Sequence, residues 1–482
     1  MWKSQYVFGR MLEAFICETR LERIWDNLMK ERIVLLSIIS SMLVLLYFFQ
    51  NHMNTPCALI TILSFMTLYT AYMQIAFKHR VRKQRKHPVE KNYSYTPYVS
   101  IMIPAHNEAE VIEKTIENIS KIEYPKYEII VIDDRSEDNT AQVLEEICTR
   151  YLKLKYFSRT KEAFPGKSAV LNDALKIAKG DAILVFDADA RVKPNFLREL
   201  IPALEPEQVG AVQARKVIIN REQNFLTRCQ DNEMAIDTHF QVGRDSVKGA
   251  VELRGNGELI KRTALEDVGG WNIYTITDDL DLSTRMQIKG WDVRFCPEVC
   301  VYEEGVPSYI PLVKQRRRWI EGSIRRYLEH FSDVLTSKDM SLRVSLDMTA
   351  YITEFILPVW MVSEIAFQSY RFIKDDPNWI LSSAALSLAM CGFFIVALFY
   401  SLRKYVKLKP MENLIQSIAT SLYIVVLWFP IAVFIVFKII FMKNNMEWGK
   451  TKHGTAKVTT NLVDDNKQKT KEEKQAEELI NA

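Results

Sequence analysis

The chain has 482 residues, of which 48% are hydrophobic and 25% are charged, and its formal net charge is +4. This length accommodates one catalytic domain together with membrane helices. The small net charge, and the lack of a basic stripe with interleaved aromatics outside the membrane flanks, argue against a nucleic-acid partner. The seven cysteines are scattered without a CxxC pair. We therefore expect reduced thiols, no zinc site and a catalytic part in the cytosol.

The N-terminal part of the chain predicts a membrane hairpin. Residues 1–32 mix acidic and basic side chains before any apolar run, which predicts a cytosolic amphipathic segment and not a cleavable signal peptide. Two charge-free runs, 33–49 and 57–77, are each close to the roughly 20 residues that cross a bilayer. The basic run 78–86 places the end of this hairpin in the cytosol by the positive-inside rule.

Residues 95–305 have the pattern of a soluble α/β domain. Short, continuous apolar runs are typical of buried parallel strands. Here they alternate with helical stretches, which implies βαβ units and a doubly wound sheet. The expected strands are Val99–Ile103, Ile129–Ile132 and Ala182–Phe186, and the expected helices are Glu110–Ile122, Asp138–Arg150 and Lys167–Ala178. Such sheets bind ligands beyond the carboxyl ends of their strands.

A C-terminal membrane region is expected at 344–442. Its three apolar segments are 344–372, 379–400 and 414–442, and the first is the weakest because it carries three acidic residues, which we expect to face the protein interior. The basic loop 401–410 indicates the cytosolic side.

The sequence does not determine on which side of the membrane the polar tail, residues 443–482, lies. Five crossings would leave this tail outside the cell. Pro430, midway along the last segment, could instead kink that segment or turn it into a re-entrant hairpin.

Polar residues follow the first two expected strands. Pro104 is expected to end the first strand, and we place it with Asn107 and Glu108 at the UDP-sugar. Asn107 and Glu108 could hold a ribose or a base, or else cap the next helix. Asp133 and Asp134 end the second strand. Two adjacent carboxylates are costly unless a partner uses them, and a uracil imide or ribose hydroxyl is a natural partner. An Asp-rich turn is the alternative for one of the two.

The third strand ends in Asp187-Ala-Asp189. Carboxylate oxygens suit Mg²⁺ or Mn²⁺, and such an ion neutralises a departing diphosphate. The alternative is a structural turn. A DxD motif alone is weak, since Asp279-Leu-Asp281 repeats it without a preceding apolar strand.

A fourth acidic motif is Thr277-Asp278-Asp279-Leu-Asp281. Inverting sugar transfer needs one base for the acceptor hydroxyl, and we assign that role to Asp279, with Asp278 beside it. The alternative is that these acids complement a helix dipole.

Basic and aromatic residues gather in Gln315-Arg-Arg-Arg-Trp319, within an amphipathic region, 306–336, that we expect at the membrane surface. Arg318 can contact a diphosphate and Trp319 can stack on a sugar ring. Lys167 begins a helix after Pro165-Gly166, and we place it at the donor. The P-loop spacing is absent, which argues against an ATPase.

In combination, these motifs resemble the membrane-embedded processive members of glycosyltransferase family 2, which include cellulose, hyaluronan and poly-N-acetylglucosamine synthases. The resemblance spans about residues 33–450 and implies an α/β GT-A domain inserted in an α-helical transmembrane bundle. It implies a uridine contact at Asp133 or Asp134, a metal site at Asp187 and Asp189, the base at Asp279, and donor contacts from Gln315, Arg318 and Trp319. Trp448-Gly-Lys-Thr451 is similar to a Trp-containing element after the last membrane helix of these synthases.

Two departures concern the acceptor. Asp278 stands where the family has Glu, and Leu253-Arg-Gly-Asn-Gly257 replaces a Cys-Gly-Ser-like segment. The latter stretch is similar to relatives that glucosylate diacylglycerol. We assign Asn256, Gly257 and Trp319 to the acceptor.

The sequence therefore predicts an inverting, metal-dependent glycosyltransferase that uses UDP-glucose or UDP-N-acetylglucosamine. We expect a multi-pass protein of the bacterial inner membrane with a cytoplasmic catalytic domain. Its acceptor would be a glycan or a lipid, and a small accessory membrane subunit could be a further partner. The leading interpretation is a processive β-glycan (exopolysaccharide) synthase. The alternatives are a β-glucosyltransferase acting on diacylglycerol and a non-enzymatic transporter or receptor with a degenerate nucleotide-binding domain.

Overall fold

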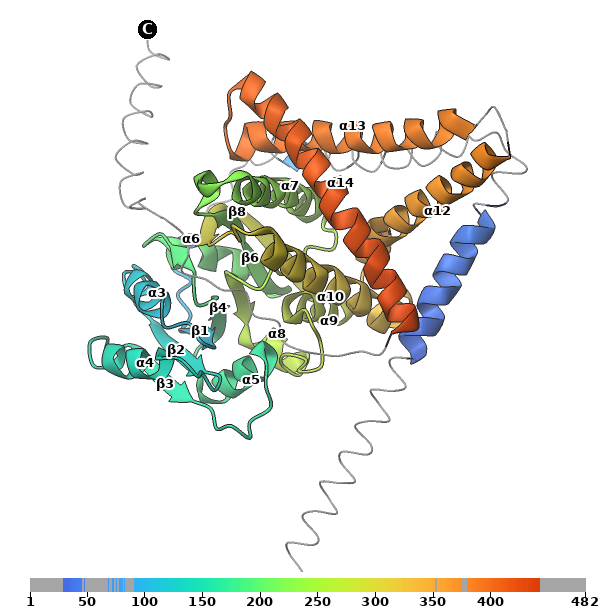
Figure 1. Ribbon diagram of the computed structural model, residues 1–482. Coiled ribbons are helices and arrows are strands. Elements are labelled where there is room, and N and C mark those ends of the chain that lie inside the picture. The colour runs from blue at the N-terminus through green and yellow to red at the C-terminus, as the bar shows by residue number, and fades with distance from the viewer. Residues whose placement is uncertain are drawn as a thin grey trace, which may run out of the picture.

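The computed structural model describes residues 29–45, 47, 68, 72, 75, 78–80, 82, 91–351, 353–374 and 379–442 (Figure 1). Residues 1–28 of the segment expected at 1–32, almost all of the second apolar run at 57–77, and the tail at 443–482 lie outside the described residues.

The described part of the chain contains one eight-stranded sheet, in the order β3-β2-β1-β4-β7-β6-β8-β5. Strands β1, β2, β3 and β4 are parallel to one another, and β6 is parallel to β8, whereas β7 is antiparallel to both β4 and β6, and β5 is antiparallel to β8. The strands are β1 (Val99–Ala105), β2 (Tyr127–Asp133), β3 (Leu154–Ser158), β4 (Ala182–Val185), β5 (Arg191–Val192), β6 (Val209–Ile218), β7 (Glu258–Lys261) and β8 (Asp292–Glu303).

The three expected strands are confirmed as β1, β2 and β4, but the sheet as a whole is mixed and not a simple doubly wound parallel sheet. The antiparallel strand β7 lies between β4 and β6. One expectation was wrong in detail: Pro104 lies inside β1, paired in register with Ile132, and does not end the strand.

Alternate side chains of the central strands enter two different cores, because successive residues of a strand point to opposite faces. Ile101 and Ile103 belong to one core, and Met102 belongs to the other. The helices around the sheet are α3 (Ile112–Ile119), α4 (Thr140–Cys148), α5 (Lys167–Ile177), α6 (Phe196–Leu200), α7 (Phe225–Val247), α8 (Arg262–Asp267), α9 (Asp278–Ile288) and α10 (Tyr309–Thr336), with short 3₁₀ turns η1 (Ile201–Leu204) and η2 (Arg221–Gln223).

Four further helices follow: α11 (Leu342–Ala350), α12 (Thr353–Ile373), α13 (Trp379–Tyr405) and α14 (Pro410–Phe441). The single segment expected at 344–372 is thus two helices. The first of them packs on the sheet domain, where Asp347 accepts a hydrogen bond from the backbone N–H of Ala250 at 2.7 Å.

Helix α14 runs without a break through Pro430, so it is not a hairpin. Within the described residues, α14 alone is long and apolar enough to cross a membrane. A third hydrophobic core joins α14 to α7, α10, α12, α13 and the helix that includes residues 29–45 (Figure 1).

Candidate active site

The carboxylates at the end of β2 are fully engaged by neighbouring protein groups. Asp134 Oδ1 accepts hydrogen bonds from Arg135 Nε at 2.9 Å and from Arg159 at 2.8 Å, and its Oδ2 accepts one from the backbone N–H of Gly166 at 3.2 Å. Asp133 accepts from the hydroxyls of Ser136 and Ser158. Both aspartates are buried. They fix the loops at this edge of the sheet, and their expected contact with uridine stays a prediction.

Asn107, which follows β1, also holds a loop. Its backbone is left-handed, with a φ of 56°, and its Oδ1 accepts a hydrogen bond from the backbone N–H of Glu137 at 2.6 Å. The backbone N–H of Glu108 donates to Thr140 Oγ1 at 2.7 Å. The alternative of a helix cap is not observed, because α3 begins at Ile112 with Val111 as its N-cap.

The two aspartates after β4 have different surroundings. Asp189 is buried and accepts a hydrogen bond from the backbone N–H of Glu304 at 3.0 Å, which ties it to the end of β8. The Asp187 side chain remains 37% exposed and pairs with Lys167 Nζ at 2.7 Å. The two carboxylates supply the oxygen ligands that Mg²⁺ and Mn²⁺ prefer.

Lys167 connects the end of β4 with the loop before β7. Its ammonium also donates to the carbonyl of Gly255 at 2.8 Å. Burial alone would lower the pKa of Lys167, but the nearby charges of Asp187, Asp278 and Glu258 outweigh it and hold that pKa above its ordinary value. The side chain is therefore a permanent cation among several acids.

The acidic motif at 277–281 opens α9, with Thr277 as the N-cap. Burial raises the pKa of Asp279 to about 6; the charge of Asp278 adds to this effect and Lys167 opposes it. A carboxylate with a pKa near 6 is a suitable general base near neutral pH. Gly255 permits close approach, since a Cβ there would lie 3.1 Å from Asp279 Oδ2.

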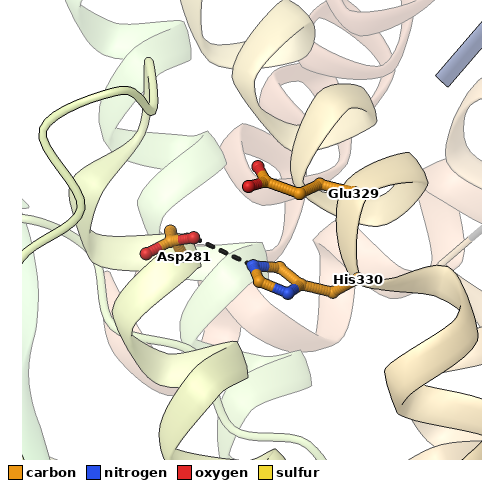
Figure 2. Close-up of side chains that lie close together, drawn as sticks. All are labelled: Asp281, Glu329 and His330. Atoms are coloured by element: carbon orange, nitrogen blue, oxygen red, sulfur yellow. Dashed lines mark hydrogen bonds and ion pairs between the residues drawn. The ribbon is translucent and has the colours of Figure 1, made fainter. Parts of the chain in front are cut away.

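The third acid of that motif serves a different purpose. Asp281 is buried and pairs with Arg285 Nε at 2.7 Å. It also lies 2.9 Å from His330 Nε2 of α10, an interaction drawn as a dashed line in Figure 2. Glu329 stands beside His330 in the same view, so these three residues could form a metal-binding cluster. Because Arg285 already compensates the charge of Asp281, we assign this cluster to the packing of α9 against α10.

The Gln315–Trp319 motif lies in α10. Burial lowers the pKa of Arg318, and the charges of Asp278, Asp187 and Asp279 oppose that change. Asp187 and Asp278 also act on Lys167, so the two cations share these acids. Gln315 accepts a hydrogen bond from Arg316 at 2.6 Å, and the Arg316 guanidinium lies 4.2 Å from the Trp319 ring.

The predicted acceptor residues Asn256 and Gly257 lie between the β4 and β8 ends. Asn256 is buried; its Oδ1 accepts from the backbone N–H of Asp187 and its Nδ2 donates to Glu303, each at 3.2 Å. Gly257 has a φ of +72°, and a Cβ there would lie 2.8 Å from Val301 Cγ1. Both residues therefore pack against the ends of β4 and β8 and support the residues of the site.

Three site residues were missed from the sequence. Lys216 pairs with Glu303 at 2.9 Å and lies 5.7 Å from the Trp319 ring. Glu258 accepts a hydrogen bond from the backbone N–H of Gly255. Burial, followed by the charge of Asp279, raises the pKa of Glu258 well above its ordinary value. For Lys216 and Glu303, the sequence offers one signal: a basic residue near the end of β6 and an acidic residue at the end of the neighbouring strand β8.

Segments far apart in the sequence thus meet at one place. Lys167 of α5 and Arg318 of α10 both interact electrostatically with Asp187 at the β4 end and with Asp278 and Asp279 of α9. Two cations can bind an anionic group there, while one acid with a raised pKa can accept a proton.

Comparisons with known proteins agree with this chemistry. A profile of the family described as "Glycosyltransferase like family 2" matches residues 97–322. A "Beta-monoglucosyldiacylglycerol synthase" from Trichormus variabilis is 37% identical over 366 residues, which are 74% of this chain and 76% of that protein. The Synechocystis protein of the same name is 36% identical over 375 residues, 75% of this chain and 76% of its own length.

More distant matches include a "Poly-beta-1,6-N-acetyl-D-glucosamine synthase" from Staphylococcus epidermidis, 26% identical over 348 residues, or 70% of this chain and 82% of that protein. Among solved structures, a mannosyltransferase from Pyrobaculum calidifontis in complex with GDP-Man and Mn²⁺ has a TM-score of 0.53 at 22% identity and covers 76% of this chain and 98% of its own. This likeness supports a GT-A-like fold with a mixed sheet.

Proposed function

Because the chain belongs to glycosyltransferase family 2, we propose that it transfers glucose, with inversion, from UDP-glucose to a diacylglycerol-type lipid at a bacterial membrane. The observation that carries the reaction is the meeting of Lys167, Arg318 and Asp279 at one place, with Asp187 beside them. This arrangement offers cations for a diphosphate and a base for a hydroxyl.

The lipid acceptor replaces the polymer as the leading interpretation. Three relatives at 36–38% identity are named as synthases of β-monoglucosyldiacylglycerol, whereas the poly-N-acetylglucosamine synthase is 26% identical. The Arg254-Gly-Asn-Gly257 stretch supports the same choice. A processive β-glycan synthase remains the second candidate, favoured by the Gln315–Trp319 motif.

In the proposed reaction, Asp279 takes the proton of the acceptor hydroxyl as its oxygen attacks the anomeric carbon from the face opposite the nucleotide. The new C–O bond forms while the bond from the anomeric carbon to the phosphate oxygen breaks, and UDP leaves with that electron pair. Lys167 and Arg318 bind the diphosphate as negative charge develops on it. Trp319 stacks on a sugar ring, and the acceptor lies between it and the Asn256–Gly257 loop.

A divalent cation fits the donor set after β4. Asp187 and Asp189 offer hard oxygen ligands, and the contact with the Glu304 backbone holds the Asp189 carboxylate in place. Such an ion, Mg²⁺ or Mn²⁺, would neutralise charge on the leaving diphosphate.

The membrane location rests on the apolar helices at both ends of the chain. We propose a multi-pass protein with the hairpin 33–77 and the apolar segments of 344–442 in the membrane, and with residues 95–305 in the cytoplasm. A small accessory membrane subunit stays a prediction.

The test is transfer by purified protein in detergent, with radiolabelled UDP-glucose or UDP-N-acetylglucosamine, diacylglycerol, and Mn²⁺ or EDTA. We expect label from UDP-glucose in the organic phase, dependent on diacylglycerol and on the metal. Asp279→Asn serves as the inactive control. Label that stays in a water-soluble, high-molecular-mass product would overturn the lipid acceptor and favour the processive synthase.

A further inference from the structure

Helix α14 touches the catalytic domain at its first turns. Arg221 of η2 donates to Gln416 at 2.6 Å, and Asn232 of α7 donates to Thr420 at 2.9 Å. Just before the helix, Arg215 of β6 donates to the backbone carbonyl of Tyr405 at 3.2 Å. The N-terminal end of α14 is therefore fixed to the sheet domain.

The middle of α14 is fixed to the same domain through a buried carboxylate. Glu233 of α7 pairs with Arg316 of α10 at 2.5 Å and accepts a hydrogen bond from Trp428 of α14. The Arg316 guanidinium lies 5.7 Å from the Trp428 ring and 4.2 Å from the Trp319 ring. One arginine thus stands between α14 and the proposed sugar-stacking tryptophan.

The C-terminal end of α14 is attached as well. Lys438 pairs with Glu321 of α10 at 2.7 Å. Arg32 donates to the backbone carbonyls of Ile439 at 3.2 Å and Met442 at 2.7 Å. Neighbouring Glu31 pairs with Arg325 of α10 at 2.6 Å. This pair ties the helix that includes residues 29–45 to α10.

These contacts conflict with a crossing of the bilayer. At 1.5 Å per residue, the 32 residues of α14 extend about 48 Å, more than the roughly 30 Å of hydrocarbon in a membrane. A crossing helix would carry one of its ends to the far side, away from the catalytic domain. Both ends of α14 instead contact η2, α7 or α10, and Figure 1 shows the helix lying across α7 and α10.

The outer side of α14 is unlike that of a helix on a water-soluble surface. The face toward the protein combines polar residues in the first turns (Asn413, Ser417, Thr420 and Ser421) with apolar and aromatic residues from Tyr423 to Ile439. The opposite face, here called the outward face, consists of exposed apolar residues along the whole helix: Met411, Leu414, Ile415, Ile418, Leu422, Val426, Phe434, Phe437 and Phe441. A continuous apolar face of this length requires an apolar partner.

Cations near the N-terminal end of α14 favour a lipid bilayer as that partner. Arg403 and Lys404 lie in the last turn of α13, and Lys407 and Lys409 lie in the connection to α14. Cations next to an apolar helix face match the anionic headgroups of a cytoplasmic leaflet, while the apolar side chains reach the acyl chains below them.

We propose that α14 lies in the plane of the membrane, with its outward face embedded in the cytoplasmic leaflet and its inward face on the catalytic domain. The tail after Met442 then lies on the cytoplasmic side, whereas five crossings would leave it outside the cell. The proposal needs a membrane location but not a particular donor or acceptor.

The depth of single nitroxide labels tests this geometry. Labels at Ile415, Leu422, Val426 and Phe437 would be placed one at a time on the outward face of the full chain, with native cysteines replaced, in liposomes that contain anionic lipid. Positions 415 and 437 are about 33 Å apart along the axis. We expect all four labels at one shallow depth, with oxygen favoured over a water-soluble nickel chelate.

Two outcomes would overturn the proposal. A profile that is deepest at Val426 and shallow at Ile415 and Phe437 would mean that α14 crosses the bilayer. Access of the nickel chelate to all four labels would mean that no lipid covers this face.

A second measurement checks the side of the tail without relying on transfer activity. A C-terminal epitope on the full chain should be cleaved by protease in inside-out vesicles and protected in spheroplasts; the reverse pattern would contradict the proposal. Because neither measurement uses a donor, both can succeed where the proposed reaction fails.

Discussion

Two pairs of adjacent aspartates, Asp133-Asp134 and Asp278-Asp279, show how the same motif is used in opposite ways. Around Asp134, two arginines and a backbone N–H supply hydrogen bonds to both carboxylate oxygens. Around Asp279, the nearest charges include another acid, and burial raises its pKa to about 6. The first pair has its charge compensated and holds loops together, whereas the second keeps an acid available for proton transfer.

The largest effect is expected at the second pair. Asp279→Asn keeps the size of the side chain but removes the proton acceptor, so we expect transfer to fall by about 10²- to 10⁴-fold. Binding of UDP, measured by calorimetry, should persist. Glu145→Gln, which alters an exposed acid on α4, is the matched control and should transfer at the normal rate. Full activity of Asp279→Asn would remove the proposed base.

The corresponding change at the first pair should act on stability. Asp134→Asn removes one of the two acids that pair with the largely buried Arg159, while Asp173 stays at 2.9 Å from its Nε. Breaking a fully buried pair costs about 3–5 kcal/mol, and the remaining partner should keep the loss below that range. We expect a lower unfolding midpoint in denaturant, measured on detergent-solubilised protein. An unchanged midpoint together with a raised KM for the donor would mean that Asp134 acts mainly as the predicted nucleotide contact.

The pH dependence of transfer gives a finer test of the second pair. The base must be ionised, so the rate should fall as the pH drops through about 6. Asp278→Asn removes a like charge, which makes Asp279 easier to ionise, and the half-maximal pH of kcat/KM should move down. Lys167→Met removes an opposite charge and should move it up. Shifts in the same direction for both variants would contradict the assignment of Asp279.

The sequence predicted β1, β2 and β4 because strands buried on both faces are continuous apolar runs. Strands β6 and β8 could not be recognised in the same way. They carry Lys216 and Glu303 into the site and read as mixed, partly polar segments. The same side chains that complete the active site thus obscure the strands that present them.

The site residues show a similar limit. In the sequence, the acids of the motif 277–281 form one group. In the structure, Asp281 pairs with Arg285 and His330, which are not partners of Asp279. Successive helical residues are rotated by about 100°, so positions two apart face different directions. Which acid faces the site depends on where α9 begins, and the compensation of Asp134 by Arg159 depends on contacts 25 residues apart.

The smallest effect is expected where α10 packs against the start of α9. A Cβ on Gly322 would lie 2.3 Å from Thr277 Cγ2, so Gly322→Ala must shift one helix against the other, at a cost of about 1–3 kcal/mol for overpacking. Gly392→Ala on α13, where a Cβ meets nothing within 4 Å, is the matched control. We expect Gly322→Ala to lower both the unfolding midpoint and the transfer rate, because Thr277 precedes the two acids at the site. If only the unfolding midpoint fell, the position of Asp279 would not depend on the contact between Gly322 and Thr277. The packing of Asp279 against Gly255 would then be enough to position it.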